Sequence, residues 1–273
     1  MTAFSGNKGF TYGRFGLALV GLGMGLHLIS GTLNQAALAR GRAMWAAGGD
    51  GAKRAGSQHY LGGKLCPPAG GTDLDENEPA TAERIAEIPD SDERDSDAAA
   101  RAARSAFPSW ARTSIADRSR LLLRLADLIE QNAEELAQLE SRDSGKAISL
   151  ARTLDIPRAV ANFRFFGTAI LHFSSEAHIT DGNALNYTLR QPIGVAGLIS
   201  PWNLPLYLLS WKIAPAIAAG NTCIAKPSEL TPLTAKRLAA MSIETDNHVG
   251  VNKQAHGSGQ EPRLVDQWHG RVE

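Results

Sequence analysis

The sequence has few cysteines and no excess of charge of either sign. Its two cysteines, Cys66 and Cys223, show neither metal-ligand spacing nor a disulfide framework, so we expect no metal site and a reducing, cytoplasmic compartment. Lysine plus arginine number 28, the same as aspartate plus glutamate. This balance gives no electrostatic reason to expect nucleic acid as a partner.

The sequence also gives no firm sign of a membrane span. Residues 1–49 contain no acidic residue, and the apolar run within them, residues 15–29, is shorter than the roughly 20 residues that cross a bilayer. With Lys8 and Arg14 ahead of it, this run suits a signal h-region, and the lack of acids also suits an organellar targeting segment. We favour a third interpretation, in which residues 1–58 are a disordered or poorly packed leader unrelated to the rest.

The most informative stretch of the chain is 194–229, which predicts a strand, a sharp turn, a helix and a second strand. Residues 195–200 are an uncharged apolar run, as expected for a strand covered on both faces. The apolar segment 206–219 predicts a buried helix that stops at Gly220, and 222–225 predicts a second buried strand. In such a βαβ unit the chemistry is expected at the carboxyl ends of the strands.

The residues before this unit predict a short strand or hairpin edge, an acidic loop and a helical bundle. The strand or hairpin edge covers 60–65 and the loop covers 73–78. Helices are predicted over 96–110 with Ser96 as N-cap, over 118–131, over 132–141 with a stop at Gly145, and over 147–173 with a kink near Ile156 caused by Pro157.

The flanking segments are less regular. Residues 181–191 predict a turn and a half-buried strand, because polar and apolar side chains alternate. Pro232 is expected at the first position of a helix that runs to about residue 241. Residues 242–273 are polar and lack periodicity, which is typical of a disordered tail.

Two peptides carry a resemblance to a known family. Ile199-Ser-Pro-Trp-Asn203 and Ala225-Lys-Pro-Ser-Glu229 resemble the nucleotide-binding half of the NAD(P)-dependent aldehyde dehydrogenases. The resemblance covers roughly residues 60–241, and the two motifs together at this spacing are highly specific. It implies an α/β fold in which a helical amino-terminal bundle leads into an incomplete Rossmann-like parallel sheet, with the nucleotide-binding domain over 59–241.

The same resemblance implies roles for the residues at the strand ends. Asn203 matches the asparagine of the oxyanion hole, although it could also satisfy the backbone of the turn. Lys226 and Glu229 match a pair that binds the adenosine ribose; a carboxylate there would repel a 2′-phosphate and favours NAD over NADP. The alternative is a surface ion pair. Further cofactor contacts are expected from Ile199, Ser200, Pro201, Trp202 and Ser228.

The substrate implied is a small-molecule aldehyde, best supported as 2-aminomuconate semialdehyde, with others such as retinal left open. Arg158 corresponds to an arginine that one branch of the family uses to hold a substrate carboxylate, a task that suits the guanidinium fork. Arg164 is the competing candidate, and either could be a plain surface charge. Leu204 is expected to contact the substrate.

The catalytic thiolate and the glutamate base of the family find no match in this sequence. Cys223 lies inside an apolar strand, where a small buried side chain is expected, and Cys66 lies in the amino-terminal arm. We therefore expect the chain to be inactive alone. Two alternatives to an enzyme stay open: a truncated isoform that forms homo-oligomers or pairs with full-length subunits, and a nucleotide-binding module.

Overall fold

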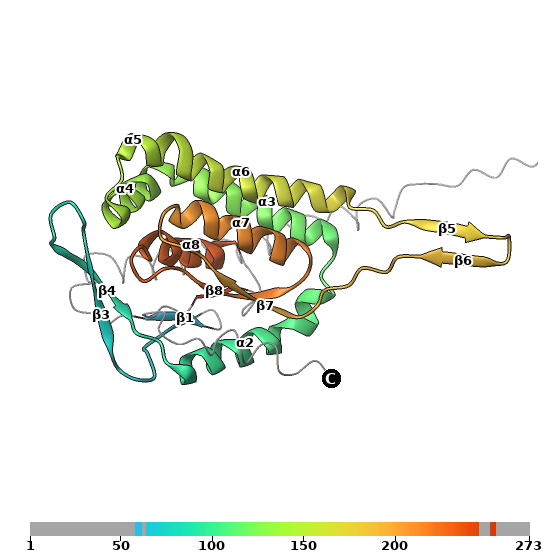
Figure 1. The fold of residues 1–273 in the computed structure, drawn as a ribbon, viewed down its shortest axis with the longest axis horizontal. Coiled ribbons are helices and arrows are strands. Elements are labelled where there is room, and N and C mark those ends of the chain that lie inside the picture. Colours follow the sequence, from blue (N-terminus) through green and yellow to red (C-terminus); the bar gives the residue numbers. More distant parts are fainter. Residues whose placement is uncertain (1–57, 62–63, 246–251, 255–273) are drawn as a thin grey trace, which may run out of the picture.

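The computed structural model describes residues 58–61, 64–245 and 252–254 as an α/β fold (Figure 1). The strands are β1 His59–Leu61, β2 Lys64–Cys66, β3 Asp73–Asn77, β4 Arg84–Pro89, β5 Ala177–Thr180, β6 Ala184–Tyr187, β7 Val195–Ile199, β8 Thr222–Lys226 and β9 Asn252–Gln254. The helices are α2 Glu93–Ala111, α3 Ile115–Gln131, α4 Ala133–Ser144, α5 Ile148–Leu150, the π-helix η2 Ala151–Asp155, α6 Ile156–Ala169, the 3-10 helix η3 Ile170–His172, α7 Pro205–Ala218 and α8 Leu233–Glu244. Within these residues no helix combines the length and the apolar character that a bilayer crossing requires.

The main sheet has the strand order β2-β1-β9-β8-β7. Strands β7, β8 and β9 run parallel, while β1 pairs antiparallel with β9 and with β2. Helix α2 lies on one face of this sheet and α7 and α8 lie on the other, with α3 and α6 forming an outer layer (Figure 1). The hydroxyl of Thr222 ties β8 to α2 by donating to the carbonyl of Ala103 at 3.0 Å.

The predicted βαβ unit is confirmed, except for the exposure of its first strand. Strand β8 is buried as expected, but it has neighbours on both sides, because β9 lies within the tail 242–273 that was predicted to be disordered. Strand β7 is the edge of the described sheet, and Ile199 at its end is 50% exposed, so the prediction of a strand covered on both faces is wrong. Helix α8 also continues past the predicted boundary at 241, to Glu244.

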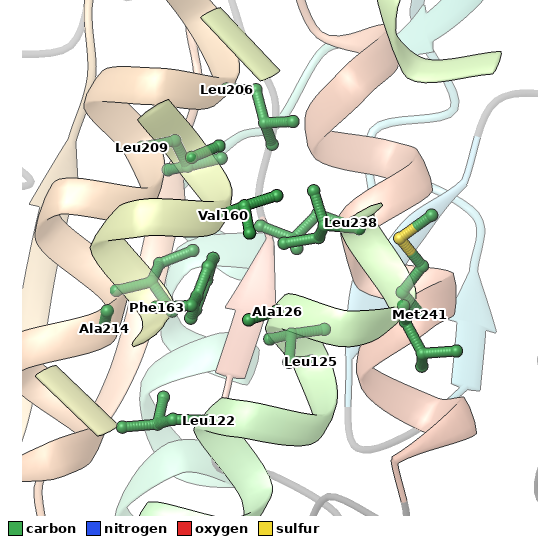
Figure 2. Packing of buried hydrophobic residues seen from close by; sticks show 14 of the residues in the cluster. Leu122, Leu125, Ala126, Val160, Phe163, Leu206, Leu209, Ala214, Leu238 and Met241 are labelled. Atoms are coloured by element: carbon green, nitrogen blue, oxygen red, sulfur yellow. The ribbon is translucent and has the colours of Figure 1, made fainter. Parts of the chain in front are cut away.

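The hydrophobic core lies between the sheet and the helices that cover one of its faces, with buried side chains from α3, α6, α7 and α8 (Figure 2). Phe163 of α6 is fully buried among Leu122, Leu209 and Ala214, which come from α3 and α7. Asn162 adds a polar link between α6 and α7, since its amide donates to Ser210 Oγ at 2.9 Å. This packing fixes α6 and α7, the two helices that carry the substrate-side candidates.

The helix boundaries differ from the predictions mainly at the amino-terminal ends. The N-cap of α2 is Asp92 and not Ser96, because Asp92 and Asp95 form a reciprocal capping box. Ser114 caps α3 by accepting from the amide of Asp117, while Gly145 ends α4 in the left-handed conformation, as predicted. Pro232 is the N-cap of α8 and precedes its first residue.

Two further segments were predicted imperfectly. The supposed acidic loop 73–78 contains strand β3, which pairs with β4 in a separate hairpin. The long helix over 147–173 is confirmed as a continuous helical segment, but the irregularity near Ile156 is a π-helix that ends shortly before Pro157, whose ring disturbs the usual hydrogen-bond pattern.

The hairpin β5–β6 projects away from the rest of the described structure (Figure 1). Each of its residues is exposed, including the apolar side chains of Ile179 and Leu185, so the predicted half-buried strand is here a fully exposed one. The predicted leader falls outside the described residues, apart from residue 58.

Candidate functional site

The candidate site lies where the two parallel strands β7 and β8 end at the same edge of the sheet. Ile199 and Lys226 are register partners, and the amide of Ser200 donates to the carbonyl of Lys226 at 3.1 Å. Thr231 Oγ1 then donates to the carbonyl of Trp202 at 3.4 Å, which joins the two loops beyond the strands. The structure therefore brings together the two motifs that the sequence singled out.

Lys226 and Glu229 form an ion pair beside this edge. Their Nζ and Oε2 atoms are 3.4 Å apart, and both side chains are partly exposed, so they remain accessible to a ligand. Ser228 is buried, and its hydroxyl accepts from the amide of Leu230 at 3.2 Å. This hydroxyl therefore stabilises the loop after β8, whereas Lys226 and Glu229 present charged groups.

The turn after β7 buries Ser200 and exposes the three residues that follow it. Trp202 is 59% exposed and Asn203 is exposed, while Ser200 is buried at the strand end and Pro201 begins the turn at the surface. Helix α7 starts directly after Leu204, with Pro205 at its first position, where the missing amide hydrogen carries no penalty. The Asn203 side chain thus stands at the amino-terminal end of a helix, where an oxyanion donor can act.

A cavity of about 580 Å³ lies between these loops and the β3–β4 hairpin. Trp202 and Glu229 line it from the strand-end loops, and Glu76 and Asp143 line it from β3 and α4. Burial raises the pKa of Glu76 to about 7, and the nearby charge of Glu229 adds to that rise. Burial likewise raises the pKa of Asp143 well above its ordinary value, with Glu76 as the second cause.

Arg158 and Arg164 both lie on α6, but their surroundings differ. Arg164 is held by two carboxylates, Glu130 at 2.6 Å and Asp127 at 3.1 Å. Arg158 instead donates to the hydroxyl of Tyr207 at 3.2 Å and lies over its ring, 5.5 Å from the centroid. No carboxylate among the described residues forms an ion pair with Arg158, so its charge is available for an anionic ligand, whereas that of Arg164 is already compensated.

Neither cysteine is placed as a nucleophile at this edge of the sheet. Cys223 is completely buried in β8, in the hydrophobic core cluster, and Cys66 lies in β2 at the opposite side of the sheet order. The prediction of a small buried side chain at Cys223 is confirmed. In the described part of the chain no group of His, Cys, Asp and Glu side chains could hold a metal ion.

Three side chains at the site were not singled out from the sequence. Tyr207 is one, and no periodic signal distinguishes it from its apolar neighbours in α7. Glu76 is another, because it belongs to an acidic run that predicts a loop. Lys146 is the third: it follows the helix stop at Gly145 and donates to the carbonyl of Asn203 at 3.2 Å. Only the tertiary contacts indicate their roles.

Comparison with protein families gives one clear match. The model of the aldehyde dehydrogenase family matches residues 67–263. Among curated proteins, the 2-aminomuconic semialdehyde dehydrogenase of Bos taurus is 53% identical over 208 residues, covering 76% of this chain and 42% of that protein. The 5-carboxymethyl-2-hydroxymuconate semialdehyde dehydrogenase of Escherichia coli is 40% identical and covers 74% of the chain and 42% of that protein.

Solved structures give the same result. PnpE from a Pseudomonas species, in complex with nicotinamide adenine dinucleotide, superimposes with a TM-score of 0.74 at 41% identity, over 77% of this chain and 43% of that one. A mutant form of an aldehyde dehydrogenase from Bacillus cereus gives a TM-score of 0.75 at 37% identity, over 79% and 44% of the two chains. The chain thus spans less than half the length of the relatives that it matches.

Proposed function

Since the chain belongs to the aldehyde dehydrogenase family, we propose that it supplies the NAD site and the oxyanion donor for the oxidation of an aldehyde to a carboxylic acid. The observation that supports this proposal is the register of β7 and β8, which pairs Ile199 with Lys226, so that the loops that follow the two strands, with Asn203 in one and Glu229 in the other, leave the same edge of the sheet. Ligands of parallel sheets bind at this position, outside the carboxyl ends of the strands.

The residues at the strand ends fit NAD. Lys226 can donate to ribose hydroxyls and Glu229 can accept from them, and both side chains stay partly exposed. Ile199, Pro201 and Trp202 offer an exposed apolar surface at the same edge. When bound, NAD supplies the hydride acceptor of the reaction. The Asn203 amide would donate to the developing alkoxide of the substrate, a contribution that is typically worth about 10²–10³ in rate.

The test is a titration of the purified chain with NAD, followed through the tryptophan fluorescence to which Trp202 contributes. A saturable change with NAD, and a weaker one with NADP, is expected because Glu229 would repel a 2′-phosphate. A folded chain that shows no saturable change with NAD would overturn the proposal.

We expect the chain alone to form no NADH from 2-aminomuconate semialdehyde, because the reaction requires an accessible thiolate. Cys223 is fully buried, and Cys66 lies across the sheet from the candidate site. The measurement is NADH absorbance with the purified wild type and with Cys223→Ala. Turnover that disappears in the Cys223→Ala variant would contradict the structural role assigned to this thiol.

For the substrate we propose a semialdehyde that carries a carboxylate, such as 2-aminomuconate semialdehyde. The support is Arg158, whose guanidinium is held by Tyr207 near the start of α7 and has no carboxylate partner among the described side chains. Leu204 would line the same region, next to Asn203. Relatives named for muconate semialdehydes are in line with this substrate class.

Arg158→Met should weaken the binding of muconate, a dicarboxylate probe, by about tenfold, because a hydrogen bond to a charged group contributes about 1.5–3 kcal/mol. Trp211 can report the binding, since its ring packs against Tyr207 at 5.9 Å. The matched control is Arg164→Met, which removes a compensated charge from the same helix. An equal loss in the control would refute the assignment of Arg158.

A second candidate function is that of a subunit that associates with other copies or with full-length relatives. The exposed β5–β6 hairpin favours it, since Ile179, Leu185 and Tyr187 are each about two-thirds exposed or more. Analytical ultracentrifugation of the purified chain should therefore show oligomers or aggregates. Co-expression with a full-length relative should increase the soluble fraction of the chain. A monodisperse monomer with a cooperative thermal melt would speak against this candidate.

A further inference from the structure

The side chain of Lys146 contacts the turn that carries Asn203. Lys146 follows α4, directly after Gly145, and its side chain is only 11% exposed. A buried ammonium group is unfavourable unless charged or polar partners surround it. The identity and origin of those partners therefore indicate why a lysine stands at this position.

Two buried carboxylates flank the Lys146 ammonium group. Asp155 Oδ2 lies 2.6 Å from Nζ and Glu140 Oε1 lies 3.7 Å from it, and both side chains are fully buried. Asp155 is the last residue of the π-helix η2, a distortion that occurs frequently at functional sites. Glu140 comes from α4 and also accepts from the amide of Leu206 in the first turn of α7.

The third contact of Lys146 is with the candidate site itself. Its Nζ donates to the main-chain carbonyl of Asn203 at 3.2 Å. Lys212 and Thr231 hold the carbonyls of Ile199 and Trp202 in the same way. Because a held carbonyl fixes its peptide plane, the bond from Lys146 restricts the backbone of Asn203 and with it the direction of the side chain.

We propose that Lys146 is a positioning residue, which orients Asn203 by binding its main-chain carbonyl while Asp155 and Glu140 hold the ammonium group in place. The role that this gives to the Asn203 side chain rests on the proposed function. The hydrogen bond from Lys146 to the Asn203 carbonyl does not rest on the proposed function. The bond and the role of the Asn203 side chain can therefore be tested separately.

The sequence offers a direct probe of this bond. Asn203-Leu204 is the only Asn-Leu dipeptide in the chain. Labelling asparagine with ¹³C at the carbonyl and leucine with ¹⁵N therefore yields a single carbonyl–amide cross-peak in the NMR spectrum, which reports on the carbonyl that Lys146 binds. In the wild type we expect one sharp signal.

In Lys146→Met the carbonyl signal should shift and broaden, because the Asn203 carbonyl loses its charged donor. Two buried carboxylates without a cation can prevent this variant from folding, so the triple variant Lys146→Met/Glu140→Gln/Asp155→Asn removes all three charges together. It should fold and show the same two changes.

The matched control is Arg152→Met. Arg152 lies in the same π-helix but forms an exposed ion pair with Glu134, so the Asn203 carbonyl signal of this variant should match that of the wild type. An unchanged carbonyl signal in the folded triple variant would overturn the proposal. If the wild type itself binds no NAD, the proposed function fails, while the signal still decides whether Lys146 holds Asn203.

Discussion

Replacing Lys226 and Glu229 together by alanine is expected to weaken NAD binding about 100-fold, since hydrogen bonds to charged groups contribute about 1.5–3 kcal/mol each. The two side chains form one partly exposed ion pair at the end of β8, and in our proposal both bind the adenosine ribose. The measurement is a fluorescence titration of the wild type and of the double variant under the same conditions.

The single variant Glu229→Gln separates charge from shape. The amide keeps the length of the side chain but removes the charge that would repel a 2′-phosphate. The affinity for NAD should therefore fall, and the ratio between the affinities for NAD and for NADP should decrease. The matched control is Asp97→Ala/Arg101→Ala, which deletes an exposed ion pair on α2. Equal NAD affinity for the wild type and the Lys226→Ala/Glu229→Ala variant would exclude the site.

Glu76→Gln is expected to stabilise the chain at about pH 8, and this gain should shrink as the pH is lowered. Burial raises the pKa of Glu76 from 4.5 to about 7 in the folded state. Below the pKa that Glu76 has in the unfolded chain, its carboxyl group is protonated in both the folded and the unfolded state, so it does not lower the folding stability. As the pH rises from about 4.5 to 7 the unfolded chain releases the proton first, and folding stability falls.

The expected size of the effect is about 1.4 kcal/mol for each unit of pKa shift that the amide removes. Burial and the charge of Glu76 both raise the pKa of Asp143, so Asp143 should ionise more easily in the variant, and this adds to the gain. Chemical denaturation of both proteins across this pH range gives the difference. Glu83→Gln, an exposed position in the same hairpin, is the control, and an identical pH profile for both variants would contradict the assignment.

The elements that could be predicted from the sequence are those with a local signal. The strand 222–225, the helix before it and the stop at Gly145 are all confirmed, because apolar runs and glycine act over a few residues. Gly220 is also explained by the structure: its φ of +85° and the close approach of Arg118 leave no room for a Cβ atom.

The features that the sequence did not predict depend on distant parts of the chain. Strand β9 is short and polar, and it is a strand only because β8 and β1 lie on either side of it. Lys146 and Tyr207 acquire roles only when α7 is packed against α4 and α6. The candidate residues Asn203, Lys226 and Glu229 could be proposed from the sequence because their two motifs resemble those of a known family and lie at two strand ends of one βαβ unit. The side chains that contact these loops come from elsewhere in the chain and carry no such motif.

The position of β9 in the sheet has a consequence for how the chain folds. Strand β1 lies near the amino-terminal end of the described structure, and β9 lies at its carboxyl-terminal end. The two strands are direct neighbours in the sheet, with Tyr60 paired to Gln254. Pairing residues so far apart in sequence is slow, because the entropy of closing the loop is lost before the contact is gained. During synthesis the helical layer can therefore form well before the sheet, and the open edge of β8 would be exposed to aggregation for that interval.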